Sequence, residues 1–190
     1  GANIKCKPIH FLQNGIMASV FCKYILNIEK PKVGLLNIGE EDAKGNELVK
    51  EAYSLLSNSP LNFIGNAEGR DVFDGNFDIV VCEGFIGNVL LKFAEGLSIS
   101  LISAFVSEAK KSLLSKFGVW LCKPALKQLA SRTDYSEYGG VPLLGIDGIC
   151  IIAHGRSDSK AIQNAIREAI QFGKYQVNNH IISELASSHS

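Results

Sequence analysis

Four segments of this chain share one pattern, in which a run of β-branched and apolar residues ends in a polar turn that contains glycine. In chain order they are KVGLLNIGEE, LNFIGNAEGRD, DIVVCEGFIGN and GICIIAHGRSD. Each pattern predicts a buried strand that runs into a loop. Ligands of open α/β sheets bind at the carboxyl ends of parallel strands. We therefore expect the four turns to lie along one sheet edge and to build one site.

Helical patterns alternate with these strands. A first helix is expected over residues 8–26, where apolar residues recur at helical spacing. These residues are Phe11, Leu12, Ile16, Val20 and Tyr24. The expected strands are 33–38, 61–64, 78–82 and 149–153, with a short helix over 47–56. The alternation is typical of βαβ units and predicts a single α/β domain over residues 1–190, with a mostly parallel sheet.

The opening residues GAN resemble the turn that follows a strand, so we expect an N-terminal part of the domain to precede this sequence. A long helical segment follows Asn88 and is apolar on nearly every side, which is typical of a helix buried in a core or a subunit interface. Its pattern is expected to break at Gly118, and a second helical stretch is expected from about Pro124 to Arg132. Together the two segments predict a protruding helical hairpin over about residues 89–132.

The last expected helix starts near residue 157, with Ser157 or Asp158 as its N-cap. Ile162, Ile166 and Ile170 are expected on its buried face. The tail from residue 177 onward is polar and weakly patterned, so no further element is predicted there.

Charge and cysteine content exclude several classes of protein. Nineteen basic and nineteen acidic side chains cancel, so bulk charge does not favour nucleic acid as a partner. The five cysteines form no C-x-x-C pair, which argues against a disulfide framework and favours a reducing, cytosolic setting. Cys82 and Cys150 fall inside apolar strands, where a thiol stays protonated. The most apolar stretch, residues 89–106, contains Lys92 and Glu95, so no membrane-spanning segment is expected.

The turn EGFIGN joins the third strand to the long helix and is suited to an anion. A helix N-terminus presents unpaired N–H groups and the positive end of a dipole. Gly84 and Gly87 would let a ligand approach the backbone closely. Asn88 would cap the helix or donate a hydrogen bond, and Lys92 would add positive charge. The alternative is a tight structural turn beside a solvated lysine, because short glycine motifs have many false positives.

The turn AHGRSD repeats this arrangement after the last strand. Gly155 is flexible, Arg156 is able to form a bidentate pair with phosphate, and Ser157 stands at the helix start. His154 is a candidate donor to an oxyanion or a proton-transfer group. The alternative for this histidine is a hydrogen-bonded structural residue, which is the commoner role at a strand end.

The first two turns add further polar groups. They are Asn37, Gly39 and Glu40 after the first strand and Asn66, Glu68 and Arg70 after the second. The carboxylates of the site, Glu40, Glu68 and Glu83, are alternatively expected to hold the cations Arg70, Arg156 and Lys92 in place. No spacing of acidic residues and histidines matches a metal site, so no metal is predicted.

Taken in order, several segments resemble the successive signatures of the PlsX family, the bacterial phosphate acyltransferases of phospholipid synthesis. The segments are PKVGLLNIGEEDAKG, LNFIGNAEGRDVF, DIVVCEGFIGNVLLK, DYSEYGGVPLLGIDG and AHGRSDSKAI, preceded by GANIKCKPIHFLQNGIMASV. The resemblance covers roughly residues 1–176 without large insertions. The order of the strand-end turns is also weakly similar to phosphotransacetylase. The family pattern differs in having aspartate where this chain has Glu83, and in an N-terminal half with an Asp-x-Met-Gly-Gly-Asp turn.

The resemblance implies a three-layer α/β/α sandwich similar to isopropylmalate dehydrogenase, used as a homodimer. It implies a reaction in which inorganic phosphate attacks the thioester of a long-chain acyl-acyl-carrier protein and gives acyl phosphate, with no cofactor. The product would pass to a membrane glycerol-3-phosphate acyltransferase. The expected location is therefore cytoplasmic, with peripheral contact to the membrane surface.

For that reaction the candidate catalytic residues are Asn88 and His154, as donors to the oxyanion, and Lys92, as a positive charge near phosphate. The candidate substrate-binding residues are Asn37, Gly39, Glu40, Asn66, Glu68, Arg70, Glu83, Gly84, Gly87, Gly155, Arg156 and Ser157.

The predicted hairpin carries a separate signal, because five lysines and no acidic residue lie between Lys110 and Lys127. They surround apolar residues, of which Phe117, Val119, Trp120 and Leu121 form the candidate membrane tip. Such a basic amphipathic tip is suited to anionic lipid. A dimer core and a contact with acidic acyl-carrier protein are the alternatives.

Two other functions stay open from the residues alone. A nicotinamide-dependent decarboxylating dehydrogenase would share the sheet architecture, although the metal-binding aspartates and substrate arginines that it needs are not found. A non-catalytic module that binds membrane or carrier protein is the second alternative.

Overall fold

The computed structural model of the protein describes residues 5–132, 139–155 and 157–188, with the side chains of 125–132 left out. Its centre is a parallel sheet of three strands in the order β2–β1–β3. The strands are β1 (Val33–Leu36), β2 (Phe63–Ala67) and β3 (Ile79–Val81), and β1 pairs with both neighbours. The predicted α/β class with a parallel sheet is confirmed.

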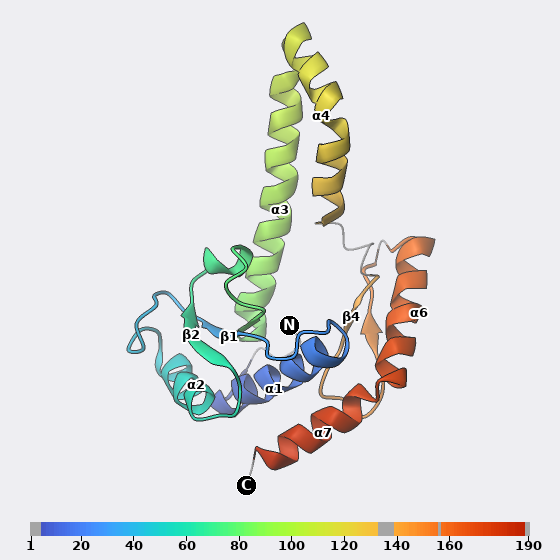
Figure 1. The fold of residues 1–190 in the computed structure, drawn as a ribbon. Helices are drawn as coiled ribbons and strands as arrows, with labels where there is room; N and C mark the ends of the chain where they lie inside the picture. Colours follow the sequence, from blue (N-terminus) through green and yellow to red (C-terminus); the bar gives the residue numbers. More distant parts are fainter. Residues whose placement is uncertain (1–4, 133–138, 156, 189–190) are drawn as a thin grey trace.

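Helix α1 (Pro8–Tyr24) and helix α2 (Glu47–Ser57) pack beside this sheet (Figure 1). Pro8 occupies the first helical turn, where its missing N–H costs nothing. Phe11, Leu12 and Ile16 of α1 are buried against the fully buried Val33 and Leu35 of β1. The apolar spacing therefore predicted this helix and its buried face correctly.

The C-terminal region differs from the expectation in two ways. Helix α6 (Ser159–Lys174) starts after Asp158, whose carboxylate accepts a hydrogen bond from the Ala161 N–H at 2.8 Å, so the predicted cap is confirmed. The predicted buried face is wrong, because Ala161, Ala165 and Phe172 are buried instead. Ile162, Ile166 and Ile170 are 45%, 57% and 64% exposed.

A further helix, α7 (Val177–Ser187), forms in the tail where no element was predicted. Val177 and Ile181 are buried in a second cluster with Phe172 of α6 and Met17 and Val20 of α1. Two apolar residues one helical turn apart are a weak sequence pattern, and α7 is stabilised by this tertiary packing.

The last strand does not belong to the parallel sheet. Strand β5 (Ile151–Ile152) pairs antiparallel with β4 (Val141–Pro142), and the Leu143 N–H donates to the Cys150 carbonyl at 2.8 Å. Gly145 and Gly148 have positive φ between these strands and reverse the chain locally. The expectation that all four glycine turns follow strands of one sheet is therefore wrong for the fourth turn.

The hairpin is present but its boundaries differ. Helix α3 (Gly84–Ala109) and helix α4 (Leu113–Arg132) stand out from the body of the molecule (Figure 1). The predicted break at Gly118 is wrong, since the chain reverses between 110 and 112, and both Gly118 and Pro124 lie inside α4. A single glycine costs a helix only about 1 kcal/mol, which a long helix tolerates.

Helix α3 is exposed over most of its length in this chain. Several of its large apolar side chains, such as Leu91, Phe93 and Ile99, are more than half exposed, so the described residues do not bury them in a core. By length and composition α3 also meets the criterion for a membrane span. The prediction that no segment meets this criterion is wrong, because a stretch with only the two charged residues Lys92 and Glu95 is still apolar enough on average.

Candidate functional site

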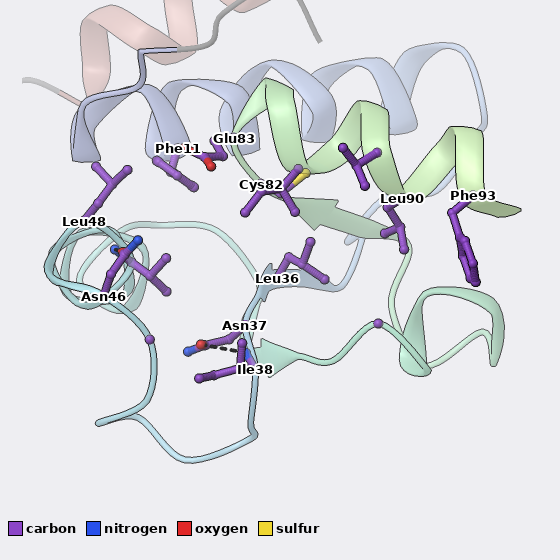
Figure 2. Close-up of a pocket in the computed structure, with 15 residues that line it drawn as sticks. Phe11, Leu36, Asn37, Ile38, Asn46, Leu48, Cys82, Glu83, Leu90 and Phe93 are labelled. Atoms are coloured by element: carbon purple, nitrogen blue, oxygen red, sulfur yellow. Dashed lines mark hydrogen bonds between the residues drawn. The ribbon is translucent and has the colours of Figure 1, made fainter.

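Three of the four predicted turns meet at the carboxyl edge of the parallel sheet. Asn37 and Ile38 follow β1, Gly69 follows β2, and Glu83 follows β3. All four residues line one cavity of about 550 Å³, together with residues of α1, α2 and α3 (Figure 2). The predicted convergence of strand ends is thus confirmed for these three turns.

The first turn of α3 forms one end of this site. Glu83 occupies the N-cap position and makes no side-chain bond to the first helical N–H groups. Gly84 is buried, and a Cβ atom on Gly87 would lie 3.0 Å from the Cys82 Sγ atom. These glycines therefore let α3 start close against β3. The predicted capping role of Asn88 is wrong, because the helix begins four residues before it.

Asn37 is nearly fully buried and holds the loop after β1. Its Nδ2 group donates to the Lys44 carbonyl at 3.1 Å, and its Oδ1 atom accepts from the Ile38 N–H at 2.8 Å. Gly39 is also buried, and a Cβ atom there would lie 2.7 Å from the Glu41 carboxylate. Both residues shape the loop backbone at the site.

Asn66 joins the turns after β1 and β2. Its Nδ2 group donates to the Glu41 carbonyl at 3.0 Å and to the Glu40 carbonyl at 3.4 Å. Its Oδ1 atom is buried and has no partner among the described residues. The amide thus fixes the spacing of the two turns.

Arg70 is the centre of an ion-pair group at the same edge. Its guanidinium lies 3.2 Å from the Glu40 carboxylate, 3.1 Å from that of Glu68 and 3.6 Å from that of Asp71. The prediction that carboxylates of the site hold Arg70 in place is confirmed. Exposed ion pairs of this kind contribute little stability, but this group links the turns after β1 and β2.

Asn88 and Lys92 lie on α3 beyond its first turn, and neither lines the cavity. The residues of α3 that do so are Ile86, Val89, Leu90 and Phe93. At 100° per residue, Asn88 and Lys92 belong to a different face of the helix. The Lys92 ammonium pairs with Glu95 at 2.8 Å, one turn further along.

His154, Gly155 and Ser157 follow β5 and therefore belong to the antiparallel hairpin rather than to the parallel sheet. His154 and Gly155 are exposed, and the Ser157 N–H donates to the His154 carbonyl at 2.9 Å. The hydroxyl of Ser157 is buried without a partner among the described residues. Arg156 lies outside the described residues, so its predicted role stays a prediction.

Cys82 is unsuited to nucleophilic chemistry. Burial raises the pKa of the Cys82 thiol above its ordinary value, and the Glu83 carboxylate acts in the same direction. Cys82 therefore stays protonated, as predicted. Neither cysteine lies inside a strand as predicted: Cys82 follows β3 and is half-buried, and Cys150 precedes β5 and is exposed. Within the described residues no group of three acidic, histidine or cysteine side chains is placed to hold a metal ion.

The cavity wall was not predicted from the sequence. It includes Leu36 from β1, Leu48 and Val49 from α2, and the four apolar residues of α3 named above (Figure 2). The helical spacing of residues 86, 89, 90 and 93 places them on one face of α3, and this spacing was the sequence signal from which the wall could have been predicted. It was hidden because α3 is apolar on its other faces as well.

Residues 1–180 match the family described as fatty acid synthesis protein. The phosphate acyltransferase of Pelotomaculum thermopropionicum is 50% identical over 188 residues, which are 99% of this chain and 54% of that protein. The phosphate acyltransferases of Campylobacter jejuni (50% identical) and Aquifex aeolicus (48% identical) each match 97% of this chain and 56% and 55% of their own lengths. The chain thus spans about half the length of these relatives. Because the family match covers nearly every residue and agrees with the sequence resemblance, this chain belongs to the fatty acid synthesis protein family.

Proposed function

We propose that this chain carries the substrate-binding sheet edge of a phosphate acyltransferase. The enzyme would convert inorganic phosphate and a long-chain acyl-acyl-carrier protein into acyl phosphate for phospholipid biosynthesis. The observation that carries the proposal is the meeting of three strand-end turns with the N-terminus of α3 in one cavity. The name shared by the relatives supports the reaction class.

In the proposed reaction a phosphate oxygen attacks the carbonyl carbon of the acyl thioester. A tetrahedral oxyanion forms, the C–S bond breaks, and the carrier thiolate leaves as acyl phosphate is produced. Phosphate dianion is already a nucleophile, so no covalent enzyme intermediate is required. The protein would contribute positioning and stabilisation of negative charge.

Backbone N–H groups at the start of α3 are the proposed phosphate donors, because a helix N-terminus carries unpaired N–H groups and a partial positive charge. Asn88 and Lys92 lie one and two turns further along the same helix, on a face that does not line the cavity, and are proposed to contact the part of the substrate that lies outside it. His154 and Arg156 are proposed to complete the site from the turn after β5.

The proposal is tested by assaying the full-length protein for phosphate-dependent formation of acyl phosphate, trapped as a hydroxamate with hydroxylamine. We expect product without nicotinamide or metal, with saturation in phosphate. A requirement for a nicotinamide cofactor would instead support the dehydrogenase alternative. Binding of carrier protein without any product would support the non-catalytic module.

The finer architecture is part of the same proposal. We infer that the full-length protein is a three-layer α/β/α sandwich of the isopropylmalate dehydrogenase type and that two copies associate. The exposed apolar surface of α3 supports this inference, because a single soluble chain rarely leaves such a helix uncovered. Size-exclusion chromatography with light scattering measures the association directly.

We further propose that the hairpin tip contacts the membrane surface. Trp120 is 65% exposed and its ring stacks on that of Phe117 at 5.9 Å, while Leu121 is exposed and Val119 half-buried beside them. Lysines at 110, 111, 116 and 123 surround these apolar groups. The proposed location is therefore cytoplasmic and peripheral, where acyl phosphate would reach a membrane glycerol-3-phosphate acyltransferase.

A further inference from the structure

The cavity at the carboxyl edge of the sheet has a largely apolar wall, which plays no part in binding phosphate. Most of its lining is aliphatic or aromatic, drawn from α1, the end of β1, the first turn of α2 and one face of α3. These residues are Phe11, Leu36, Leu48, Val49, Leu90 and Phe93 (Figure 2). Phosphate alone would gain nothing from such a wall.

The amides in the lining are already engaged by their own loops. Asn37 donates to the Lys44 carbonyl and accepts from the Ile38 N–H. Asn46 is the N-cap of α2, and its side-chain oxygen accepts from the Val49 N–H at 2.9 Å. Three of the four side-chain amide atoms of these two residues are thus satisfied by their own backbone and need no polar ligand in the cavity.

The remaining polar groups, Cys82 and Glu83, lie where β3 runs into α3. Burial keeps the Cys82 thiol neutral, so it behaves as a small apolar group. Glu83 is the one charged side chain among the described lining residues, and it stands at the N-terminus of α3. The cavity thus places one carboxylate beside the proposed phosphate donors, in a wall that is otherwise mostly apolar.

We propose that this cavity holds the alkyl chain of the acyl substrate, with the thioester carbonyl beside the first turn of α3 and the chain running along the face that ends at Phe93. This inference rests on the proposed function and names the binding site for one of its two substrates. A volume of about 550 Å³ is in the range typical of small-molecule sites. From Ile86 to Phe93 the helix advances about 10 Å, which gives the chain an extended path.

The test uses two adjacent leucines of α3 in the full-length protein. Leu90 lines the cavity, whereas Leu91 is 61% exposed and does not. Leu90→Trp fills the cavity and is expected to lower kcat/KM for a palmitoyl thioester, relative to a butyryl thioester, by about tenfold or more, because each excluded methylene loses apolar contact. Leu91→Trp is expected to leave the ratio of the two values unchanged.

Binding is measured separately in a background where Trp120 and any tryptophan outside these 190 residues are replaced by phenylalanine, so that the introduced tryptophan is the sole one. The probe is a brominated acyl chain short enough to fit beside the introduced side chain. It should quench the tryptophan fluorescence of Leu90→Trp but not that of Leu91→Trp. Leu90→Ala enlarges the cavity and should shift the substrate preference toward longer or bulkier acyl chains. This variant replaces Leu90→Trp in the test if the tryptophan prevents folding.

An equal loss on both thioesters, or no loss on either, would overturn the acyl-chain site and leave the proposed function standing. Equal quenching of both introduced tryptophans would overturn it too, as would a cavity filled by another part of the full-length protein in a crystal structure. If the wild-type protein makes no acyl phosphate from either thioester, the proposed function itself fails, and the quenching comparison still decides whether the cavity binds alkyl chains.

Discussion

The two arginines predicted for the site, Arg70 and Arg156, are compared through their acidic neighbours, in the structure for Arg70 and in the sequence for Arg156. Arg70 is held by Glu40, Glu68 and Asp71, so its charge is already balanced by carboxylates. In the sequence, Arg156 stands in the segment HGRS, which contains no acidic residue. Asp158 follows this segment as the N-cap of α6. The ion pairs favour structural support as the role of Arg70, and the role of Arg156 as a phosphate ligand stays a prediction.

Arg156→Ala is therefore expected to raise the apparent KM for phosphate, or to lower kcat/KM, by about tenfold to a thousandfold, the scale of a donor lost from a dry site. Arg70→Ala is expected to lower kcat/KM by about tenfold through looser turns. Steady-state kinetics with varied phosphate measure both. A folded Arg156→Ala protein with unchanged phosphate dependence would remove this residue from the site.

Cysteine reactivity provides a second prediction at the residue scale. Because burial raises the pKa of the Cys82 thiol, its thiolate should form only above the ordinary thiol pKa of about 8.5. Iodoacetamide at pH 8 should therefore modify the exposed Cys150 at least about tenfold faster than Cys82. Peptide mapping by mass spectrometry gives both rates. Modification of Cys82 at the same rate as Cys150 would contradict the burial of this thiol.

Glycines in α3 permit a test at the scale of one element. Gly96 lies in the middle of the helix with nothing within 4 Å of an added Cβ atom, whereas a Cβ atom on Gly87 would lie 3.0 Å from Cys82 Sγ. Gly96→Ala should raise the free energy of unfolding by up to about 1 kcal/mol, the propensity difference between the two residues. Gly87→Ala should give no such gain, because the added methyl group crowds β3. Urea unfolding compares the two, and an equal gain would show that α3 does not pack closely on β3.

At the same scale, sequence patterns predicted helices and strands well where the local apolar periodicity matches the face that is buried in the fold. Runs such as IVV and the apolar face of α1 predicted β3 and α1, since their burial depends on one dominant periodicity. The partner of β5 was not predictable in this way. Its pairing depends on the reversal at Gly145 and Gly148, and the strand itself is apolar in either sheet. The rotation of α6 also depends on small alanines, which a search for large apolar residues overlooks.

At the scale of the whole molecule, the hairpin is the part least explained by this chain alone. Leu113, Leu114 and Trp120 are exposed at its tip, and the long α3 is exposed below it. The sequence indicated an apolar helix but not what covers it, because an all-round apolar pattern fits a core, a partner helix or lipid equally. The candidate site shows the same limit, since convergence at the sheet edge was predictable from the strand ends and the cavity wall was not.

Trp120→Ser is expected to weaken binding of the full-length protein to vesicles that contain anionic lipid by about tenfold, because an interfacial tryptophan and its neighbours lose apolar contact. Phe73→Ser is the control, since Phe73 is an exposed aromatic residue outside the hairpin, and it should bind as the wild type does. Liposome flotation measures all three proteins. Equal flotation of the Trp120 variant and the wild type would argue against insertion of the tip.

The most direct measurement is a crystal structure of the full-length protein with bound phosphate. The ion is expected at the N-terminus of α3, in contact with first-turn N–H groups and bordered by the turns after β1 and β2. The Arg156 guanidinium should reach it from the turn after β5. Phosphate bound only at a distance from this sheet edge, with Arg156 directed away from α3, would contradict the account.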